Sequence, residues 1–330
     1  MSIDLDIVSN VLIGTDGELY LAGGNHSVLK FATGEFRVRE ESIVNMRENL
    51  AFRRGMAARY GFAYMHMIAP EKYRVVSEAF PVKEISSLAE QYKAGGCEGM
   101  IDPVAEFRSA LPMRSYYQTD SHWAPHGKII AARLIAEGAG HDPLDIAASE
   151  AEALKSLKPT PDRFCGDLGR KLNPKRDEET FTYKPEHVIH TFENGLPHDF
   201  ENPINDGRIV LTESDADCAE GTLLIFGDSY LHQSLVALTF FFKRIIFCRT
   251  RWFHEEIVGM TQPDIVVTQQ AERYLSFVYP DSGAPNFLFL PQMLGRHPAP
   301  SQSEALALAK AFGFGRELDM RPFARQLTPS

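Results

Sequence analysis

The stretch TLLIFGDSY, residues 222–230, joins an apolar run to a glycine and a short polar turn. Five consecutive apolar or β-branched residues, 222–226, are typical of a strand buried on both faces. Gly227 permits a sharp turn, and a helical pattern follows from Ser229. A strand, a tight turn and a helix in this order place Ser229 at the carboxyl edge of a sheet, where α/β proteins form their sites.

Three further apolar runs predict strands of the same kind, at 62–70 (FAYMHMIAP), 244–248 (RIIFC) and 264–268 (DIVVT). Helical patterns occur at 42–60, with Ser42 as a candidate cap, at 85–93, from 125 to about 138, and between the last two strands. Residues 15–24 predict a turn and a short strand. Strands that alternate with helices predict an α/β fold with a mostly parallel sheet and helices on both faces.

The chain length and composition predict one large domain over residues 1–330, because 330 residues with 44% apolar content can bury a substantial core. Residues 142–205 are rich in Pro, Asn, Asp and Lys, and we expect an inserted lobe or a loop-rich cover there. Residues 292–330 are expected to form a C-terminal tail.

The charge balance of the chain makes some classes of binding partner unfavourable. A net charge of −10, from 44 acidic and 34 basic residues, disfavours nucleic acid and anionic membrane surfaces. The most apolar window, 235–242, is too short to span a bilayer, so we expect no membrane insertion. The four cysteines match no CxxC pattern, which favours reduced thiols. No basic, long apolar leader opens the sequence, which predicts a cytoplasmic protein, with a periplasmic location as the alternative for a trimmed sequence.

Ser229 is the candidate nucleophile. Next to a helix start, backbone N–H groups and the positive end of the helix dipole could stabilise an oxyanion. The alternative is that Ser229 only caps a helix.

The stretch YYQTDSHWAPHG, residues 116–127, offers the base that a serine hydroxyl needs. His122 is the candidate base and Asp120 the acid that orients it, because alternate residues of an extended segment point to the same side. His126 is a competing base. A metal held by His122, His126 and Asp120 is a further alternative, although we predict no metal site.

Aromatic residues near these motifs could stack on sugar rings, although packing is the expected role for most of them. Trp123 is expected to be a packing wall, with sugar stacking as its alternative. The candidates are Tyr116, Tyr117, Trp123, Tyr230 and Trp252. Basic residues between 155 and 176 could meet an anionic glycan or a phosphate, or form a solvated surface.

Two blocks, TDSHW at 119–123 and FGDSY at 226–230, together resemble signatures of the alginate O-acetyltransferase-like branch of the SGNH-hydrolase superfamily. Weaker likenesses lie in the same order, so the resemblance extends over residues 16–275. They are DGELYLAGG at 16–24, IAPEK at 68–72, CGDLG at 165–169 and PDIVVTQQAERYL at 263–275. The departures are Ser121, Ala124 and Ala271, where the family often has Thr, Asn and Pro.

The resemblance implies roles for individual residues. Ser229 matches the nucleophile, His122 the base and Asp120 the acid, in a motif order rearranged from that of ordinary SGNH esterases. Tyr274 matches a tyrosine of the family site, and Arg251 an arginine that contacts substrate. Tyr230 and Trp123 are further candidates for substrate or oxyanion contacts.

The expected function is therefore serine-dependent O-acetyl transfer to a bacterial polysaccharide or oligosaccharide. The first alternative is a carbohydrate acetyl esterase with the same triad, and the second a non-catalytic glycan-binding or assembly protein. We expect no bound cofactor. The expected partners are a glycan acceptor, an acetyl donor and, as a further possibility, polysaccharide-synthesis proteins.

Overall fold

The apolar runs form the centre of a seven-stranded sheet with the order β5-β4-β12-β10-β11-β9-β8. The computed structural model describes residues 5–110, 113–196 and 205–314. Neighbouring strands run parallel from β5 to β11, and β9 and β8 are added antiparallel. In sheet order, the strands are β5 (Met100–Ile101), β4 (Ala63–Ala69), β12 (Ile265–Ala271), β10 (Ala219–Gly227), β11 (Phe242–Arg249), β9 (Ile209–Ser214) and β8 (Ile189–Glu193).

The central strand β10 is buried on both faces, as the apolar run predicts. Leu223, Leu224 and Ile225 have no exposed surface. Leu223 pairs with Ile265 of β12 on one side and with Ile245 of β11 on the other. The side chains of a strand alternate between the two faces, so β10 contributes to a separate core on each face.

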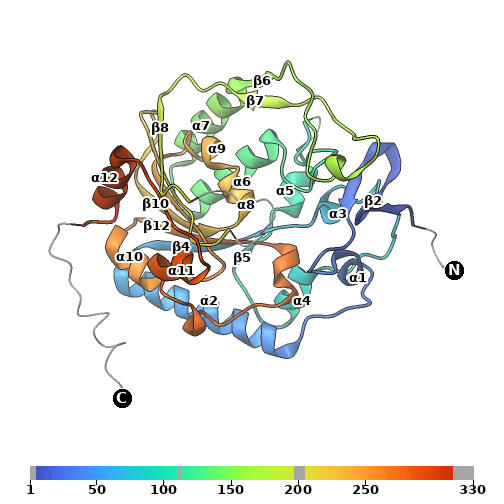
Figure 1. Ribbon diagram of the computed structural model, residues 1–330, viewed down its shortest axis with the longest axis horizontal. Coiled ribbons are helices and arrows are strands. Elements are labelled where there is room, and N and C mark those ends of the chain that lie inside the picture. Colours follow the sequence, from blue (N-terminus) through green and yellow to red (C-terminus); the bar gives the residue numbers. More distant parts are fainter. Residues whose placement is uncertain (1–4, 111–112, 197–204, 315–330) are drawn as a thin grey trace.

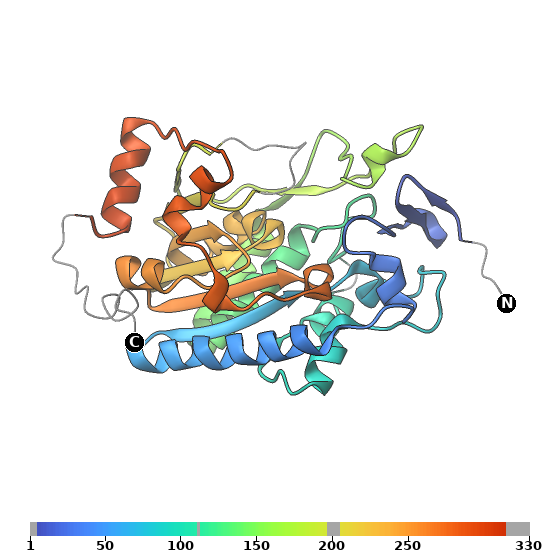
Figure 2. The same cartoon turned by 60° about the horizontal axis from the view of Figure 1, so that its bottom comes forward.

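Helices cover both faces of this sheet, which confirms the predicted fold class (Figure 1). On one face lie α5 (Val104–Arg108), α6 (Pro125–Gly138), α7 (Pro143–Ser156) and α9 (Leu235–Leu238). On the other lie α2 (Glu40–Tyr60), α4 (Leu88–Ala94), α10 (Glu255–Thr261) and α11 (Leu290–Met293). Figure 2 shows α2 running along the underside of the sheet.

The predicted helix starts are partly correct. Pro125 begins α6 at the first helical position, as predicted, because a missing N–H is no loss there. The cap of α2 is Arg39 rather than Ser42, whose buried hydroxyl is 2.5 Å from the Tyr92 hydroxyl. Gly61 ends α2 with a positive φ of 77°, which a glycine adopts at little cost.

The N-terminal residues form a small antiparallel sheet of β1 (Ile7–Val8), β2 (Val11–Ile13) and β3 (Leu19–Leu21) beside α1 (Val28–Ala32) and α3 (Lys72–Val75). The buried ammonium of Lys72 pairs with Glu18 at 2.9 Å and donates to the carbonyls of Leu19 and Gln118, both at 2.8 Å. Lys72 therefore connects the small sheet to the chain that leads into residues 119–123.

Within the expected inserted lobe or loop-rich cover at 142–205, the described residues 142–196 form a helix and several short strands. Asp142 caps α7 by accepting a hydrogen bond from the N–H of Leu144, and Ile146 and Ala153 of this helix are buried. β6 (Leu157–Pro159) pairs with β7 (Phe181–Tyr183), and β8 joins the main sheet. Residues 197–204 of this segment lie outside the described residues.

The expected tail also contains structure. α12 (Gln302–Ala311) begins with a capping box between Ser301 and Glu304, and Leu308, Ala311 and Phe312 are buried. Residues 315–330 lie outside the described part. Among the described residues, no helix combines the length and the apolar character needed to cross a bilayer.

Candidate active site

The side chains of Ser229, His122 and Asp120 form a continuous series of contacts, with His122 in the middle. Ser229 begins α8 (Ser229–His232) directly after β10, and its Oγ lies 2.9 Å from Nε2 of His122. Nδ1 of His122 lies 2.7 Å from Oδ1 of Asp120. Ser229 and His122 are partly exposed, whereas Asp120 is buried. The structure therefore brings together three side chains that are up to 109 positions apart in the sequence.

A tight turn, rather than an extended segment, brings Asp120 to His122. One carboxylate oxygen, Oδ1 of Asp120, accepts hydrogen bonds both from the backbone N–H of His122, at 2.8 Å, and from its ring. An ionised carboxylate can only accept, so Nδ1 of His122 carries the proton and Nε2 is free to accept the hydroxyl proton of Ser229. The predicted pair is present, but the extended geometry used to predict it is wrong.

The carboxylate of Asp120 is held in its ionised form. Burial alone would raise the pKa of Asp120, but the hydrogen bonds and charge of His122 and the backbone N–H of Asp167 hold that pKa well below its usual range. The N–H of Asp167 donates to Oδ2 of Asp120 at 2.8 Å. Both oxygens are therefore occupied by donors, which fixes the orientation of the carboxylate.

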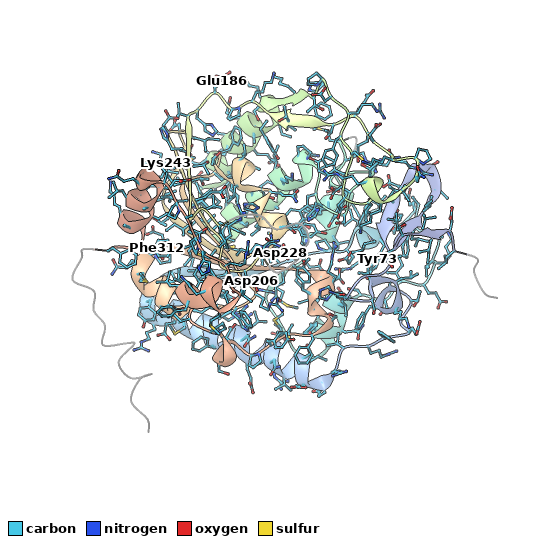
Figure 3. The ribbon with its side chains drawn as sticks, viewed as in Figure 1. Tyr73, Glu186, Asp206, Asp228, Lys243 and Phe312 are labelled. Carbon is cyan, nitrogen blue, oxygen red and sulfur yellow. The ribbon has the colours of Figure 1, made fainter. Side chains whose placement is uncertain are left out.

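The turn before Ser229 is tied to the neighbouring strand β12 by Asp228, which is labelled in Figure 3. Its carboxylate accepts hydrogen bonds from the N–H of Tyr230 at 2.9 Å and from the N–H of Ala271 at 2.6 Å. Its own N–H donates to Oε1 of Gln269 at 3.1 Å. These contacts fix the position of the nucleophile relative to the end of β12.

The same contacts reduce the number of backbone N–H groups near Ser229 that are free to stabilise an oxyanion. Asp228 uses the N–H of Tyr230, whereas among the described residues the N–H of Ser229 makes no hydrogen bond. A helix begins at Ser229, as predicted, but α8 is a single turn and the chain then forms the short α9. A one-turn helix has a small dipole, so the Ser229 N–H itself is the better candidate donor.

Tyr230 and Trp123 lie behind the site and not at its surface, which corrects their assignment as candidate substrate contacts. Tyr230 is 2% exposed and Trp123 is 0% exposed. The indole N–H of Trp123 donates to the hydroxyl of buried Tyr116 at 2.9 Å, and its ring packs edge-on against Tyr230 at 5.0 Å. The ring of Tyr230 lies 4.8 Å from that of His122. The aromatic pair forms a packed wall, because neither ring has a face open to a ligand.

Tyr274 and Arg251 follow the carboxyl ends of β12 and β11, the two strands that flank β10 and Ser229. Tyr274 is partly buried in η3 (Glu272–Ser276), and burial together with the charge of Asp228 raises its pKa. Arg251 is exposed, pairs with Asp206 at 3.5 Å, and lies over the rings of Trp252 and Tyr279 at 5.3 and 5.8 Å. In the described part of the chain, neither Tyr274 nor Arg251 hydrogen-bonds to the three central side chains.

A cavity of about 750 Å³ lies beside Arg251 and Tyr274, because its lining includes Tyr279, whose ring lies under Arg251, and His26. Neither Ser229 nor His122 lines it. His26 connects the two regions, because its ring lines the cavity, packs edge-on against Tyr274 at 4.8 Å, and lies 3.1 Å through Nδ1 from the hydroxyl of Ser276. The lining residues are polar, charged or aromatic: Asn25, His26, Ser27, Phe31, Glu35, Phe36, Arg37, Arg39, Ser276, Phe277 and Tyr279.

Asp167 is the main site residue that sequence reasoning did not assign. It belongs to the CGDLG block, whose glycines were the available signal. A Cβ on Gly166 would lie 2.4 Å from the carbonyl oxygen of Thr119, and one on Gly169 would lie 2.2 Å from that of Arg176. Both positions require glycine because another backbone passes too close for a side chain.

The alternative metal site with His126 is not formed. His126 is half-buried, and its neighbour is the backbone of Met113 rather than Asp120; burial lowers its pKa. Ligand atoms of Asp120, His122 and Asp167 do lie within 4.8 Å of one another. A cation there would compete with the hydrogen bond between Asp120 and His122, so the arrangement fits proton transfer better.

Comparison with known proteins identifies relatives of this architecture. A family model described as "SGNH hydrolase-like domain, acetyltransferase AlgX" matches residues 11–195, a segment that contains Asp120, His122 and Asp167 and ends before Ser229. No curated protein sequence matches the chain.

Several solved structures are similar in fold. A DHHW family protein from Eubacterium siraeum has a TM-score of 0.56 at 15% identity, over 85% of this chain and 96% of that one. PatB1 from Bacillus cereus has a TM-score of 0.52 at 13% identity, over 72% and 92%. The O-acetyltransferase domain of Pseudomonas putida AlgJ has a TM-score of 0.48 at 18% identity, over 87% and 99%. At these identities the likeness to the DHHW family protein and to PatB1 concerns the fold alone.

Proposed function

Because the chain belongs to the family of SGNH hydrolase-like domains described for the acetyltransferase AlgX, we propose that it is a serine-dependent acyltransferase acting on carbohydrate. More finely, we propose O-acetyl transfer to a bacterial polysaccharide or oligosaccharide. The observation that carries the proposal is the unbroken contact from Asp120 through His122 to Ser229, at 2.7 and 2.9 Å. The catalytic roles of these residues are part of the proposal.

The first half-reaction forms an acetyl-enzyme. Nε2 of His122 accepts the hydroxyl proton while Oγ of Ser229 attacks the carbonyl carbon of the acetyl donor. The backbone N–H of Ser229 is placed to stabilise the oxyanion. The leaving group departs with the proton from His122, and Asp120 stabilises the imidazolium between these steps.

The second half-reaction transfers the acetyl group. His122 removes the proton of a sugar hydroxyl, whose oxygen attacks the ester carbonyl on Ser229. Collapse of the tetrahedral intermediate breaks the bond to Oγ, and Ser229 regains its proton from His122. Water in place of the sugar hydroxyl would release acetate by the same steps, which is the esterase reaction.

The cavity beside Tyr274 is the proposed acceptor groove. Phe36 and Tyr279 are 39% and 47% exposed, and such rings suit stacking against sugars. Arg37 and Arg39 are exposed, and among the described residues they form no ion pair. We propose that an acceptor chain bound there extends past His26 and Tyr274 towards Ser229.

The decisive experiment combines a fluorophosphonate serine probe with two variants. We expect the probe to label the wild type and Ser234→Ala, but not Ser229→Ala. Ser234 is a matched control because its hydroxyl is fully buried and bonds to the Tyr230 carbonyl at 2.7 Å. Absence of labelling in the folded wild type would instead support a non-catalytic glycan-binding protein.

A second measurement separates transfer from hydrolysis. With an aryl acetate as donor and oligosaccharides as acceptors, we expect Ser229-dependent appearance of acetylated sugar by mass spectrometry. Release of acetate alone, with every acceptor tested, would favour the acetyl esterase.

A further inference from the structure

The peptide of Ser121, which connects the proposed acid to the proposed base, is held from two sides. Its N–H and its hydroxyl each donate to the carboxylate of Asp167 at 2.7 Å. Its carbonyl oxygen accepts a hydrogen bond from the hydroxyl of Tyr230 at 2.7 Å. Ser121 is 2% exposed, so water does not compete effectively for these groups.

Asp167 is rigidly attached to the turn that it holds. Besides the bond from its N–H to Asp120, the N–H of Gly166 donates to the Thr119 hydroxyl at 3.1 Å. The N–H of Gly169 donates to the Thr119 carbonyl at 2.8 Å. The loop therefore contacts Thr119, Asp120 and Ser121 in succession, and these hydrogen bonds hold the Asp167 carboxylate against the turn.

Tyr230 connects the same peptide to the nucleophile, because it directly follows Ser229. Its hydroxyl also accepts a hydrogen bond from Arg273 at 2.6 Å, and Arg273 pairs with Glu71 at 2.7 Å. Burial raises the pKa of Tyr230 well above its usual value, so the hydroxyl keeps its proton. With Arg273 donating to it, that proton is directed to the Ser121 carbonyl.

From these contacts we propose that Asp167 and Tyr230 are positioning residues, which clamp the Ser121 peptide and thereby hold His122 in line with Ser229. The catalytic role of this clamp rests on the proposed function. In the proposal, Asp167 and Tyr230 act through His122 and do not contact the substrate. It fixes the base relative to the nucleophile before an acetyl donor binds. Small displacements of a reacting group cost large factors in rate, so removing the clamp is expected to lower the acylation rate and leave acceptor affinity unchanged.

The test uses the variants Asp167→Ala, Asp167→Asn and Tyr230→Phe. It measures the rate of labelling by the fluorophosphonate probe, and kcat and KM with the aryl acetate donor and an oligosaccharide acceptor. For Asp167→Ala we expect labelling and kcat to fall by a factor of about 30 to 100, with KM within about twofold. Asp167→Asn should recover part of this loss, because its amide oxygen can still accept from the Ser121 N–H. Tyr230→Phe, which keeps the ring, should lose a factor of about 10.

Asp142→Ala is the matched control, because Asp142 also accepts a backbone N–H, at 2.8 Å, but at the start of α7. We expect it to lower the unfolding midpoint as Asp167→Ala does and to keep normal kcat. A folded Asp167→Ala protein with wild-type labelling and kcat would overturn the clamp.

A spectroscopic readout keeps the clamp separate from the proposed function. The low-field proton resonance of the His122 ring N–H bonded to Asp120 should be present in the wild type and Asp142→Ala, and lost or shifted in Asp167→Ala. If the wild type neither labels nor transfers acetyl groups, the proposed function fails while this resonance still decides the clamp. An unchanged resonance in Asp167→Ala would overturn it.

Discussion

At the scale of single residues, Asp120 is the group whose protonation and orientation matter most for the proposed chemistry. Its oxygens accept three hydrogen bonds, two from His122 and one from the N–H of Asp167. This arrangement selects the His122 tautomer with the proton on Nδ1. A carboxylate in this position serves the base by orientation and charge, without taking part in bond making.

Asp120→Asn is expected to lower kcat by about 10³- to 10⁴-fold. The amide is similar in size but has only one acceptor oxygen, whereas both oxygens of Asp120 accept hydrogen bonds. If the oxygen faces the Asp167 N–H, the NH₂ group donates to Nδ1 of His122 and favours the tautomer that leaves no lone pair on Nε2. Steady-state kinetics with an aryl acetate measures the effect, and Asp215→Asn serves as the control, since Asp215 accepts the Val188 N–H away from the site. A loss below tenfold would contradict the role of Asp120.

A second residue-scale prediction concerns Lys128 of α6, which is 8% exposed and has its ammonium 5.4 Å from the centre of the Tyr117 ring. Burial lowers the pKa of Lys128 from 10.5 to about 8, although the charge of Asp120 acts in the opposite direction. Below pH 8 both folded and unfolded chains bind the proton, and the folded state carries the full cost of the buried charge.

Lys128→Met is therefore expected to raise the free energy of unfolding by about 2–3 kcal/mol at pH 7. Between pH 8 and 10.5 the unfolded chain binds more protons, so the wild type gains stability as pH rises and the advantage of the variant shrinks. Urea unfolding of both proteins at pH 7 and 10 measures the difference. An equal advantage at both pH values, or the same gain in exposed Lys155→Met, would refute this account.

At the scale of elements, the clearest constraint is the close approach of the 166–169 loop to the turn 119–123. Gly166→Ala places a Cβ 2.4 Å from the carbonyl oxygen of Thr119, so one of the two segments must shift. We expect a loss of about 2 kcal/mol or more in unfolding free energy and a larger fractional loss of kcat. Thermal unfolding and kinetics on the same samples measure both.

Gly55→Ala is the matched control for this prediction. Gly55 lies in α2 with open space around its missing side chain, so alanine should stabilise the helix by about 1 kcal/mol and leave kcat unchanged. If Gly166→Ala behaved like Gly55→Ala, the loop would not be in contact with the turn in solution.

The elements also show what a sequence can and cannot predict here. The strands β4, β10, β11 and β12 were predictable because burial on both faces produces uninterrupted apolar runs. Ser229, His122 and Asp120 were predictable because their motifs are local. Asp167 was not assigned, because its role comes from hydrogen bonds to residues 46 and 47 positions away. α7 was missed because the surrounding prolines and lysines suggested loops, although Asp142 and Pro143 are a cap and a first helical residue.

At the scale of the whole molecule, the lining of the proposed acceptor groove is basic on balance, whereas the chain as a whole is acidic. The chain carries a net charge of −10, yet the cavity lining contains Arg37 and Arg39 against a single acidic residue, Glu35, which pairs with Lys30. A cluster of positive side chains on an acidic protein attracts anionic groups because the local electrostatic potential there is positive, although the net charge of the protein is negative.

The double variant Arg37→Ala/Arg39→Ala is expected to raise KM for an anionic oligosaccharide acceptor by roughly 5- to 20-fold, because each exposed cation contributes about 0.5–1 kcal/mol. The effect should weaken at high salt, and kcat should remain near that of the wild type. Arg59→Ala, at the exposed end of α2, is the control. Unchanged KM for neutral and anionic acceptors alike would exclude the groove as the acceptor site.

The two edge strands of the large sheet, β5 and β8, affect how readily copies of the molecule associate at high concentration. At one end β5 is only two residues long. At the other, the N–H of Glu193 on β8 donates to Glu304 of α12 at 3.4 Å, and the buried ring of Phe312, labelled in Figure 3, anchors the end of that helix. β8 itself has only five residues, so in the described part of the chain neither edge strand of the large sheet offers a long row of backbone groups to a neighbouring copy, and fibril growth by strand addition is disfavoured.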